Sequence, residues 1–441
     1  MTRAAHPSFA QSEDVSPRDR IPGCNDRDLI GSLKASKNSN IIKIRRSHFA
    51  AFIIYAVLMN SLTAFLYHLT ASEIFSQIGN AVAVCTFAIC LMISALGTRF
   101  PVGKLLGMCL IFQLTLVYFI NIQHSDIIDY IKFLEVFVIY AAARNCVGPL
   151  KIPHAAYALA ALPLVLIALG GSRLPSPGGA SWSYFPNRNT AALFYTCLLF
   201  ALSMKSTKYK IPLQIAVCVA SAKVGILIAT FAALLMSGII RFRFNTLIFS
   251  VALGVVITAT SLSGIMDRQI SIIENLIDGL WNTGISGIAN SNYSDLYDSY
   301  GSELSGYFRI MHWTEILNYF SEGGPLRWLF GYGGGYTPKF TTTGLVPHND
   351  YLKSLAEFGV FSFSLFVGLI IISIIGIRDR VQRTLFMIVS IYFFTENLLN
   401  SFSSMALLFG FAGLAWARPE GFQLRQNGRR KFAAALAQST A

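Results

Sequence analysis

Charged residues are scarce in this chain. Asp, Glu, Lys and Arg make up 13% of its 441 residues, against about 25% in an ordinary soluble protein. The apolar residues, 54% of the total, gather in runs close to the length of about 20 residues with which an α-helix crosses a bilayer. These runs lack the two-residue alternation of a membrane β-barrel. Because backbone amides in lipid must pair within their own segment, we predict an all-α integral membrane protein.

Recognisable nucleotide, zinc and disulfide motifs are also missing. The seven cysteines form no CxxC pair, which argues against a zinc site or a disulfide scaffold. The glycine-rich stretch from Gly331 to Gly335 has neither Walker spacing nor a following Lys-Ser/Thr, so we interpret it as a tight turn. Asp295 and Asp298 form a weak candidate for a cation site. We expect neither a metal nor a cofactor.

About twelve apolar segments are predicted to cross the membrane. They cover residues 49–68, 74–96, 103–121, 127–143, 154–171, 189–204, 211–221, 224–240, 245–263, 349–377, 384–399 and 402–417. The two weakest are 211–221, which is too short to cross alone, and 349–377, which begins with polar residues. The chain then divides into a disordered basic tail at 1–48, nine spans within 49–263, a large partly helical loop at 264–347, three spans within 348–417, and a basic tail at 418–441.

The distribution of positive charge predicts how this chain is oriented in the membrane. Its net charge of +13 does not indicate a nucleic-acid-binding protein, because the Lys and Arg residues sit in short clusters between apolar runs. With the N-terminus in the cytoplasm, alternation places most of the 35 Lys and Arg residues inside, as positive charge prefers. The short outside turns 69–73 and 122–126 contain none. We predict a multi-pass inner-membrane protein with both termini cytoplasmic and the loop 264–347 periplasmic.

Cations on the predicted outer side oppose this bias and are candidates for binding an anion. They are Arg173, Arg188, Lys223, Arg268, Arg309, Arg327 and Lys339. Arg188 follows Asn187 at the start of an apolar run, where a cation is not favoured by the helix dipole but a guanidinium suits a phosphate. The alternatives are snorkelling at the membrane interface and ion pairs with acidic residues of the loop.

The strongest local pattern begins at Pro347, where the long loop re-enters the membrane. A neutral His348 at the start of a helix is a competent general base, although a polar N-terminal cap explains the same residues. The stretch 306–320, which contains Arg309 and Trp313, has the spacing of an amphipathic helix along the membrane face.

Ionisable residues within predicted spans are a separate class of functional candidates. Asp129, Lys132 and Glu135 are three residues apart, so they share a helix face and can neutralise one another. Glu396, Asn397 and Asn400 are predicted near the outer end of another membrane helix.

Taken in order, five stretches resemble the O-antigen ligase/polymerase superfamily of bacterial surface-polysaccharide enzymes. They are Phe-Pro-Asn-Arg-Asn-Thr-Ala from Phe185, Ser-Ala-Lys-Val-Gly from Ser221, Arg309 with Trp313, Leu-Phe-Gly-Tyr-Gly-Gly-Gly from Leu329, and His348-Asn349 followed by Leu352, Glu357 and Gly359. The resemblance covers roughly 185–365. Many members carry Arg where this chain has Lys223, which keeps the charge but loses the bidentate geometry.

The resemblance implies a metal-independent glycosyltransferase of glycosyltransferase-C type in the bacterial inner membrane, with an undecaprenyl-diphosphate-linked glycan as donor. His348 would be the catalytic base. Arg188, Arg309 and Lys223 would bind the diphosphate, and Asn187, Asn349, Trp313 and Glu357 would support the site. Other expected partners are the bilayer, chain-length regulator proteins and flippase proteins.

Two activities remain open within this resemblance. A polymerase would join repeat units of O-antigen or exopolysaccharide, with a glycan as acceptor, and a ligase would transfer the finished chain to a lipid A core. The polymerase is slightly favoured. A transporter or flippase without chemistry is the alternative from another class. It predicts inverted repeats, and none is visible in the sequence.

Overall fold

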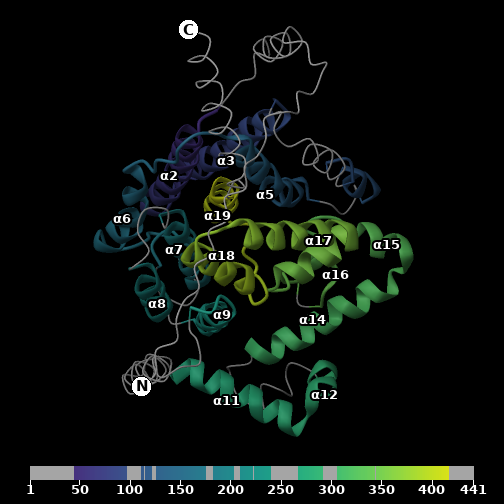
Figure 1. The fold of residues 1–441 in the computed structure, drawn as a ribbon. Coiled ribbons are helices and arrows are strands. Elements are labelled where there is room, and N and C mark those ends of the chain that lie inside the picture. The colour runs from purple at the N-terminus through teal and green to yellow at the C-terminus, as the bar shows by residue number, and fades with distance from the viewer. Residues whose placement is uncertain are drawn as a thin grey trace, which may run out of the picture. The chain divides into compact units, whose positions relative to one another are not determined.

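The computed structural model describes residues 44–96, 111–113, 115–121, 126–174, 182–202, 209–221, 223–239, 267–291, 305–342 and 344–416. In these ranges the regular elements are helices, and extended pairing is limited to three isolated bridges (Figure 1). The all-helical class is therefore confirmed for this part of the chain. The predicted span 245–263, the first eight residues of the span 103–121, and nearly all of both tails lie outside it.

The helices follow the predicted apolar runs closely. In the first half of the chain they are α2 (Arg46–Thr70), α3 (Glu73–Leu96), α5 (Ile127–Asn145), α6 (Ala155–Ala168), α7 (Arg188–Leu202), α8 (Lys210–Ser221) and α9 (Val224–Met236). The second half contains α11 (Asp267–Asn282), α12 (Gly284–Asn290), α14 (Ser305–Glu322), α15 (Gly324–Phe330), α16 (Thr337–Phe340), α17 (Asp350–Gly376), α18 (Arg380–Tyr392) and α19 (Phe402–Ala415).

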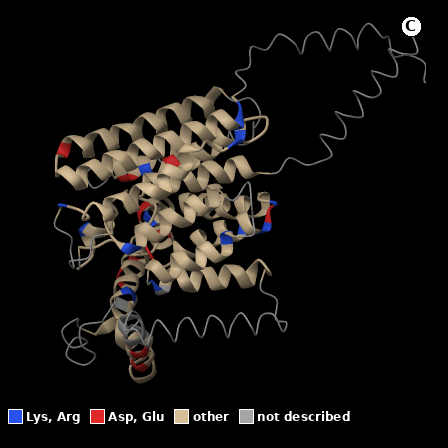
Figure 2. Cartoon of the chain, turned by 90° about the vertical axis from the view of Figure 1, so that its left-hand side faces the viewer, with Lys and Arg blue, Asp and Glu red and all other residues tan. Residues whose placement is uncertain are grey.

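Three of these helices, α2, α3 and α17, are long and apolar enough to cross a membrane, as judged by length and composition. Helices α6, α7, α8 and α19 are apolar but shorter, as is most of α9. Charged residues are rare along the bundle helices (Figure 2). These features are consistent with a helical membrane protein, and the count of about twelve crossings stays a prediction.

Helix α19 lies at the centre of the bundle, packed against α2, α5 and α7. It is apolar on all sides, as expected of a helix surrounded by other helices, and its side chains from Met405 to Leu414 are buried. Gly413 allows the closest approach, since a Cβ added there would lie 2.6 Å from Ala143 of α5. Small residues at such contacts let helix backbones pack tightly in a membrane protein.

The segment 264–347 is partly helical, as predicted, and its helix α14 covers the predicted amphipathic stretch. Helices α11, α12 and α14 contact one another, and α14 also contacts α15 and α17. Ile316 of α14 packs with Leu352 and Ala356 of α17, with Trp313 beside them. This apolar contact places α14 against the first two turns of α17, where His348 enters the bundle.

The predicted helix 384–399 is wrong at its C-terminal end. Helix α18 ends at Tyr392, and the chain runs without helix to α19. The reason is Asp350, the first residue of α17: its backbone N–H donates to the Phe393 carbonyl at 2.8 Å. Its carboxylate accepts the N–H groups of Leu398 at 2.7 Å and Leu399 at 3.1 Å. Glu396, Asn397 and Asn400, expected on a helix, therefore lie on a connecting loop, residues 393–401.

Candidate active site

His348 lies immediately before the N-cap of α17. The side chain of Asn349 caps the helix, with Oδ1 accepting the Leu352 N–H at 3.0 Å, which satisfies one of the unpaired donors at a helix start. His348 itself has φ +47°, a left-handed backbone conformation that residues other than glycine adopt rarely. Its side chain is 39% exposed. The predicted position at a helix N-terminus is thus confirmed.

Two side chains of α14 hold the segment that leads to His348. The indole N–H of Trp313 donates to the Pro347 carbonyl, and the Nε2–H of His312 faces the Leu345 carbonyl at 3.1 Å. Burial lowers the pKa of His312, so the neutral imidazole is favoured. These contacts fix the backbone on the N-terminal side of His348 and give Trp313 a positioning role, as the sequence suggested.

Glu396, which was predicted to lie on a membrane helix, contacts both Arg309 and His348. Glu396 Oε1 accepts a hydrogen bond from Arg309 Nη2 at 3.0 Å. The other oxygen, Oε2, lies 3.4 Å from His348 Nδ1. Glu396 is buried, whereas the Arg309 side chain is about one-third exposed. Arg309 comes from α14, Glu396 from the loop 393–401, and His348 from the start of α17, so three separate segments meet at this point.

His348 and Glu396 open onto a cavity of about 770 Å³. This volume lies within the range of about 300–1,000 Å³ that small-molecule sites usually have. The polar residues that line it are Asn60, Ser61, Asn80, Lys132, Glu135, Tyr184, Asn187, Asn189, Thr190, His348, Glu396, Asn397, Asn400, Ser401 and Ser403. They come from α2, α3, α5, α7, the loop 393–401 and α19, so the cavity lies at the end of the bundle where these helices meet.

None of the three cations predicted to bind a diphosphate, Arg188, Lys223 and Arg309, lines this cavity in the described structure, although Arg309 contacts the lining residue Glu396. Arg188 is the first residue of α7, and its guanidinium lies 4.9 Å from the ring centre of Trp182. Its neighbour Asn187 lines the cavity, and Asn187 Oδ1 accepts the Thr190 N–H at 3.0 Å. Lys223 directly precedes α9, whose Gly225 packs against Thr395, next to Glu396 in the chain.

Glu357 stabilises the glycine-rich turn and lies away from the cavity. Its two oxygens accept the N–H groups of Gly335 at 2.9 Å and Thr337 at 3.3 Å, and the Thr337 hydroxyl donates to it as well. Helix α17 is interrupted nearby at Gly359, which has φ +77°. The interruption frees the Glu357 carbonyl, which accepts the Gly333 N–H at 2.9 Å. The structure thus confirms that this glycine-rich stretch is a tight turn.

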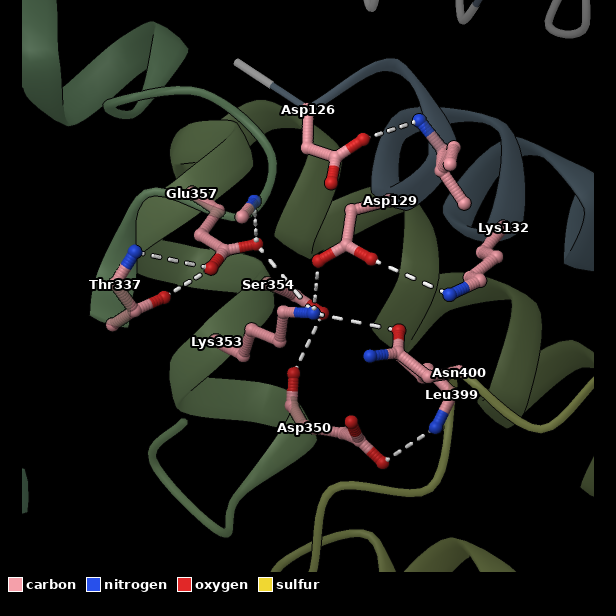
Figure 3. A network of polar contacts seen from close by, with 12 residues as sticks. Asp126, Asp129, Lys132, Thr337, Asp350, Lys353, Ser354, Glu357, Leu399 and Asn400 are labelled. Atoms are coloured by element: carbon pink, nitrogen blue, oxygen red, sulfur yellow. Dashed lines mark hydrogen bonds and ion pairs between the residues drawn. The ribbon is translucent and has the colours of Figure 1, made fainter. Parts of the chain in front are cut away.

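A buried ion network connects this turn to α5 (Figure 3). Lys353 Nζ lies 2.9 Å from Asp129 Oδ2, 3.4 Å from Asn400 Oδ1 and 3.7 Å from Glu357 Oε2. We call these four residues, together with Asp350, the Lys353 network. It ties the first two turns of α17 to α5, to the glycine turn and to the loop that carries Glu396. Lys353 had no predicted role, because none of these partners except Asp350 and Glu357 is close to it in the chain.

The predicted mutual neutralisation on α5 is only partly correct. Lys132 Nζ lies 3.7 Å from Asp129 Oδ1, but Asp129 pairs more closely with Lys353. Glu135 is buried, and its Oε1 has no hydrogen-bond partner. Asp295 and Asp298 lie outside the described residues. In the ranges that the structure describes, no three His, Cys, Asp or Glu side chains are grouped so as to hold a metal ion.

Comparison with known proteins does not assign the chain to a family. No protein-family model matches it, and no curated protein matches it.

Proposed function

We propose that this protein is a metal-independent glycosyltransferase of the bacterial inner membrane. It moves a glycan from undecaprenyl diphosphate to a sugar hydroxyl on the periplasmic face, in O-antigen or exopolysaccharide biosynthesis. The observation that carries the proposal is the contact of Glu396 with both Arg309 and His348 at a cavity lined with amides and hydroxyls. The ordered motifs that resemble the O-antigen ligase/polymerase superfamily support it independently.

His348 is the general base in this mechanism. Its Nδ1 lies 3.4 Å from Glu396 Oε2 but makes no hydrogen bond to it in this structure. In the proposed mechanism Nδ1 carries the proton on the side of this carboxylate, and Nε2 is left to accept a proton. The acceptor hydroxyl loses its proton to Nε2 as its oxygen attacks the anomeric carbon of the donor. The bond from that carbon to the diphosphate oxygen breaks, and undecaprenyl diphosphate leaves with the electron pair.

Arg309 stabilises the leaving diphosphate. A guanidinium has five N–H donors in a planar fork, and Glu396 accepts one of them, so the remaining donors are free to bind phosphate oxygens. Negative charge grows on the leaving group in the transition state, and a cation fixed in advance lowers its energy. Arg188 and Lys223, at the starts of α7 and α9, supply further positive charge in this proposal.

The membrane arrangement follows from the same proposal. About twelve crossings of glycosyltransferase-C type, with both termini in the cytoplasm, put the starts of α5, α7, α17 and α19 on the periplasmic side. A polyprenyl-linked donor is presented there. A repeat-unit polymerase and a ligase that uses a lipid A core would share the same donor and the same base. Of the two, we slightly favour the polymerase.

Substitution of His348 by Ala tests the proposal. A catalytic base predicts that long-chain product disappears while the lipid-linked donor accumulates, with protein abundance in the membrane unchanged. His154→Ala is the matched control, because His154 also precedes an apolar helix and is exposed. Normal product from His348→Ala would refute the mechanism and favour a transporter.

The polysaccharide profile of a deletion strain distinguishes the two activities. A lipid A core capped by a single repeat unit indicates an O-antigen polymerase, and loss of secreted polymer alone indicates an exopolysaccharide polymerase. A core without long chains, in cells that still make free polymer, indicates a ligase.

A further inference from the structure

The cavity extends from His348 along one face of α5. Ile128, Ile131, Lys132 and Glu135 all line it, and their spacing of three and four residues puts them on a single helix face. Glu135 is eight residues beyond Ile127, the start of α5, which corresponds to about 12 Å along the helix axis at about 1.5 Å per residue. We call the part of the cavity around Glu135 the inner end.

Glu135 is an unusual residue in this position. It is only 4% exposed, and its Oε1 has no hydrogen-bond partner within the protein. Lys132, one turn earlier, makes its ion pair with Asp129. A buried acceptor without a donor is unfavourable by about 1–3 kcal/mol, and such groups in a folded protein call for a functional explanation. Glu135 is therefore an acceptor that the fold leaves available inside a cavity.

Two Asn side chains of the same cavity also have an oxygen without a hydrogen-bond partner. Asn189 at the start of α7 and Asn397 on the loop 393–401 both line it, and the Oδ1 atom of each is buried without a partner. The three oxygens thus belong to residues of three different segments that line one space. The rings of Tyr184, Phe185 and Phe194 line it beside them, with the ring centres of Tyr184 and Phe185 4.6 Å apart.

This lining selects the chemistry of the ligand. Oxygen acceptors require O–H or N–H donors, and hydroxyls can also accept from the amide nitrogens. A phosphate is disfavoured here, because its oxygens are acceptors and supply no donor to the unpaired oxygens of the lining. An acyl or polyprenyl chain is disfavoured too, because it would leave the same polar atoms unpaired. A sugar ring, with hydroxyls on its edge and C–H groups on its faces, satisfies both the oxygens and the aromatic wall.

We propose that the inner end is a saccharide subsite in which Glu135 determines specificity. It binds one sugar ring of the glycan substrate, whose hydroxyl or acetamido hydrogens are donated to Glu135 Oε1, Asn189 and Asn397. The proposal rests on the function inferred above and refines it, because it assigns the sugar to the α5 side of the cavity and the diphosphate to the side of Arg309. Glu135 binds and orients this ring and takes no part in the proton transfer.

Saturation-transfer NMR on the full-length protein in nanodiscs tests the subsite without requiring turnover. The probes are the methyl glycosides of glucose, galactose, rhamnose and N-acetylglucosamine. The wild type is expected to bind at least one of them, and Glu135→Leu is expected to bind it about tenfold more weakly or worse, which is the effect of losing one hydrogen bond. Glu322→Leu, which replaces an exposed carboxylate outside the cavity, should bind like the wild type.

The thermal midpoint of the sugar-free protein provides the second measurement. Glu135→Leu should be as stable as the wild type or more so, because it removes a buried carboxyl group whose Oε1 has no hydrogen-bond partner. Equal sugar binding by wild type and Glu135→Leu would overturn the subsite, as would a failure of all four probes to bind. Destabilisation of the sugar-free variant would also overturn it, since it would show that Glu135 has a structural role.

The failure of this inference is distinguishable from failure of the proposed function. If His348→Ala abolishes product but Glu135→Leu binds sugar normally, the mechanism stands and the subsite does not. If sugar binding depends on Glu135 but His348→Ala still makes product, the subsite stands in a protein that is not the proposed enzyme.

Discussion

Replacement of Lys353 by Met should be the most destabilising single change in the region of the candidate site. Lys353 is buried, and its ammonium group lies 2.9 Å from Asp129 and 3.7 Å from Glu357. Methionine has a similar length but no charge, so Glu357 would stay fully buried without a cation, and Asp129 would keep only Lys132, 3.7 Å away. Removing one partner of a buried ion pair costs about 3–5 kcal/mol. We expect a loss of that size in the free energy of unfolding.

Asp129→Asn is the informative comparison. The Asn oxygen can still accept a hydrogen bond from Lys353, and Glu357 and Asn400 stay in contact with the ammonium group. The expected loss is about 1–3 kcal/mol. A double variant with Lys353→Met and Asp129→Leu should be more stable than the sum of the single changes predicts, because it also removes an orphaned carboxylate.

The assay is the thermal midpoint of the purified protein in detergent, with chain abundance in the membrane as a second readout. Loss of activity should accompany loss of stability in Lys353→Met, because the network anchors the loop that carries Glu396. If the free energy of unfolding of Lys353→Met lies within about 0.5 kcal/mol of the wild-type value, as for neutral surface substitutions, the network does not stabilise the fold and the reasoning is wrong.

Two further predictions concern His312 and Gly359. Burial lowers the pKa of His312 below its ordinary 6.5. Between that value and the lowered pKa, the unfolded chain therefore binds more protons than the folded one. The free energy of unfolding should decrease as the pH falls below 6.5. His312→Gln should lose this component of the pH dependence when thermal midpoints are compared across that window. Gly359→Ala should prevent accumulation of folded protein, because its Cβ would lie 2.2 Å from the Leu329 carbonyl oxygen at a φ of +77°. Gly368→Ala in the same helix meets no atom within 4 Å and should slightly stabilise it, and equal behaviour of the two variants would contradict the packing argument.

Much of the fold could be predicted because the determining signal is local. Long apolar runs predict helices wherever they occur, and α2, α3, α5 and α7 begin or end within a few residues of the predicted bounds. His348 before the capping Asn349 was also visible, since a cap is a short-range pattern. The glycine turn was predictable for the same reason, because positive φ angles at closely spaced glycines require only local sequence.

The contacts that complete the site are long-range and were not predictable in this way. Arg309 and Glu396 are 87 residues apart, and no periodicity relates them. The loop 393–401 looks helical by hydropathy, and only the hydrogen bonds from Asp350 explain why α18 stops at Tyr392. Glu135 was expected to be neutralised on its own helix, but Asp129 turned towards Lys353 on α17. In each case a distant residue outweighed a local preference.

In the proposed mechanism, the pairing of Arg309 with Glu396 has a consequence for the order of events. The Glu396 carboxylate and a bound diphosphate would compete for the guanidinium of Arg309, which comes from α14. A diphosphate that takes over this guanidinium leaves the Glu396 carboxylate without its strongest hydrogen bond. The carboxylate then keeps His348 Nδ1, 3.4 Å away, as its neighbour. Donor binding would thus strengthen the base before any acceptor hydroxyl arrives, and an empty site would keep that base poorly activated.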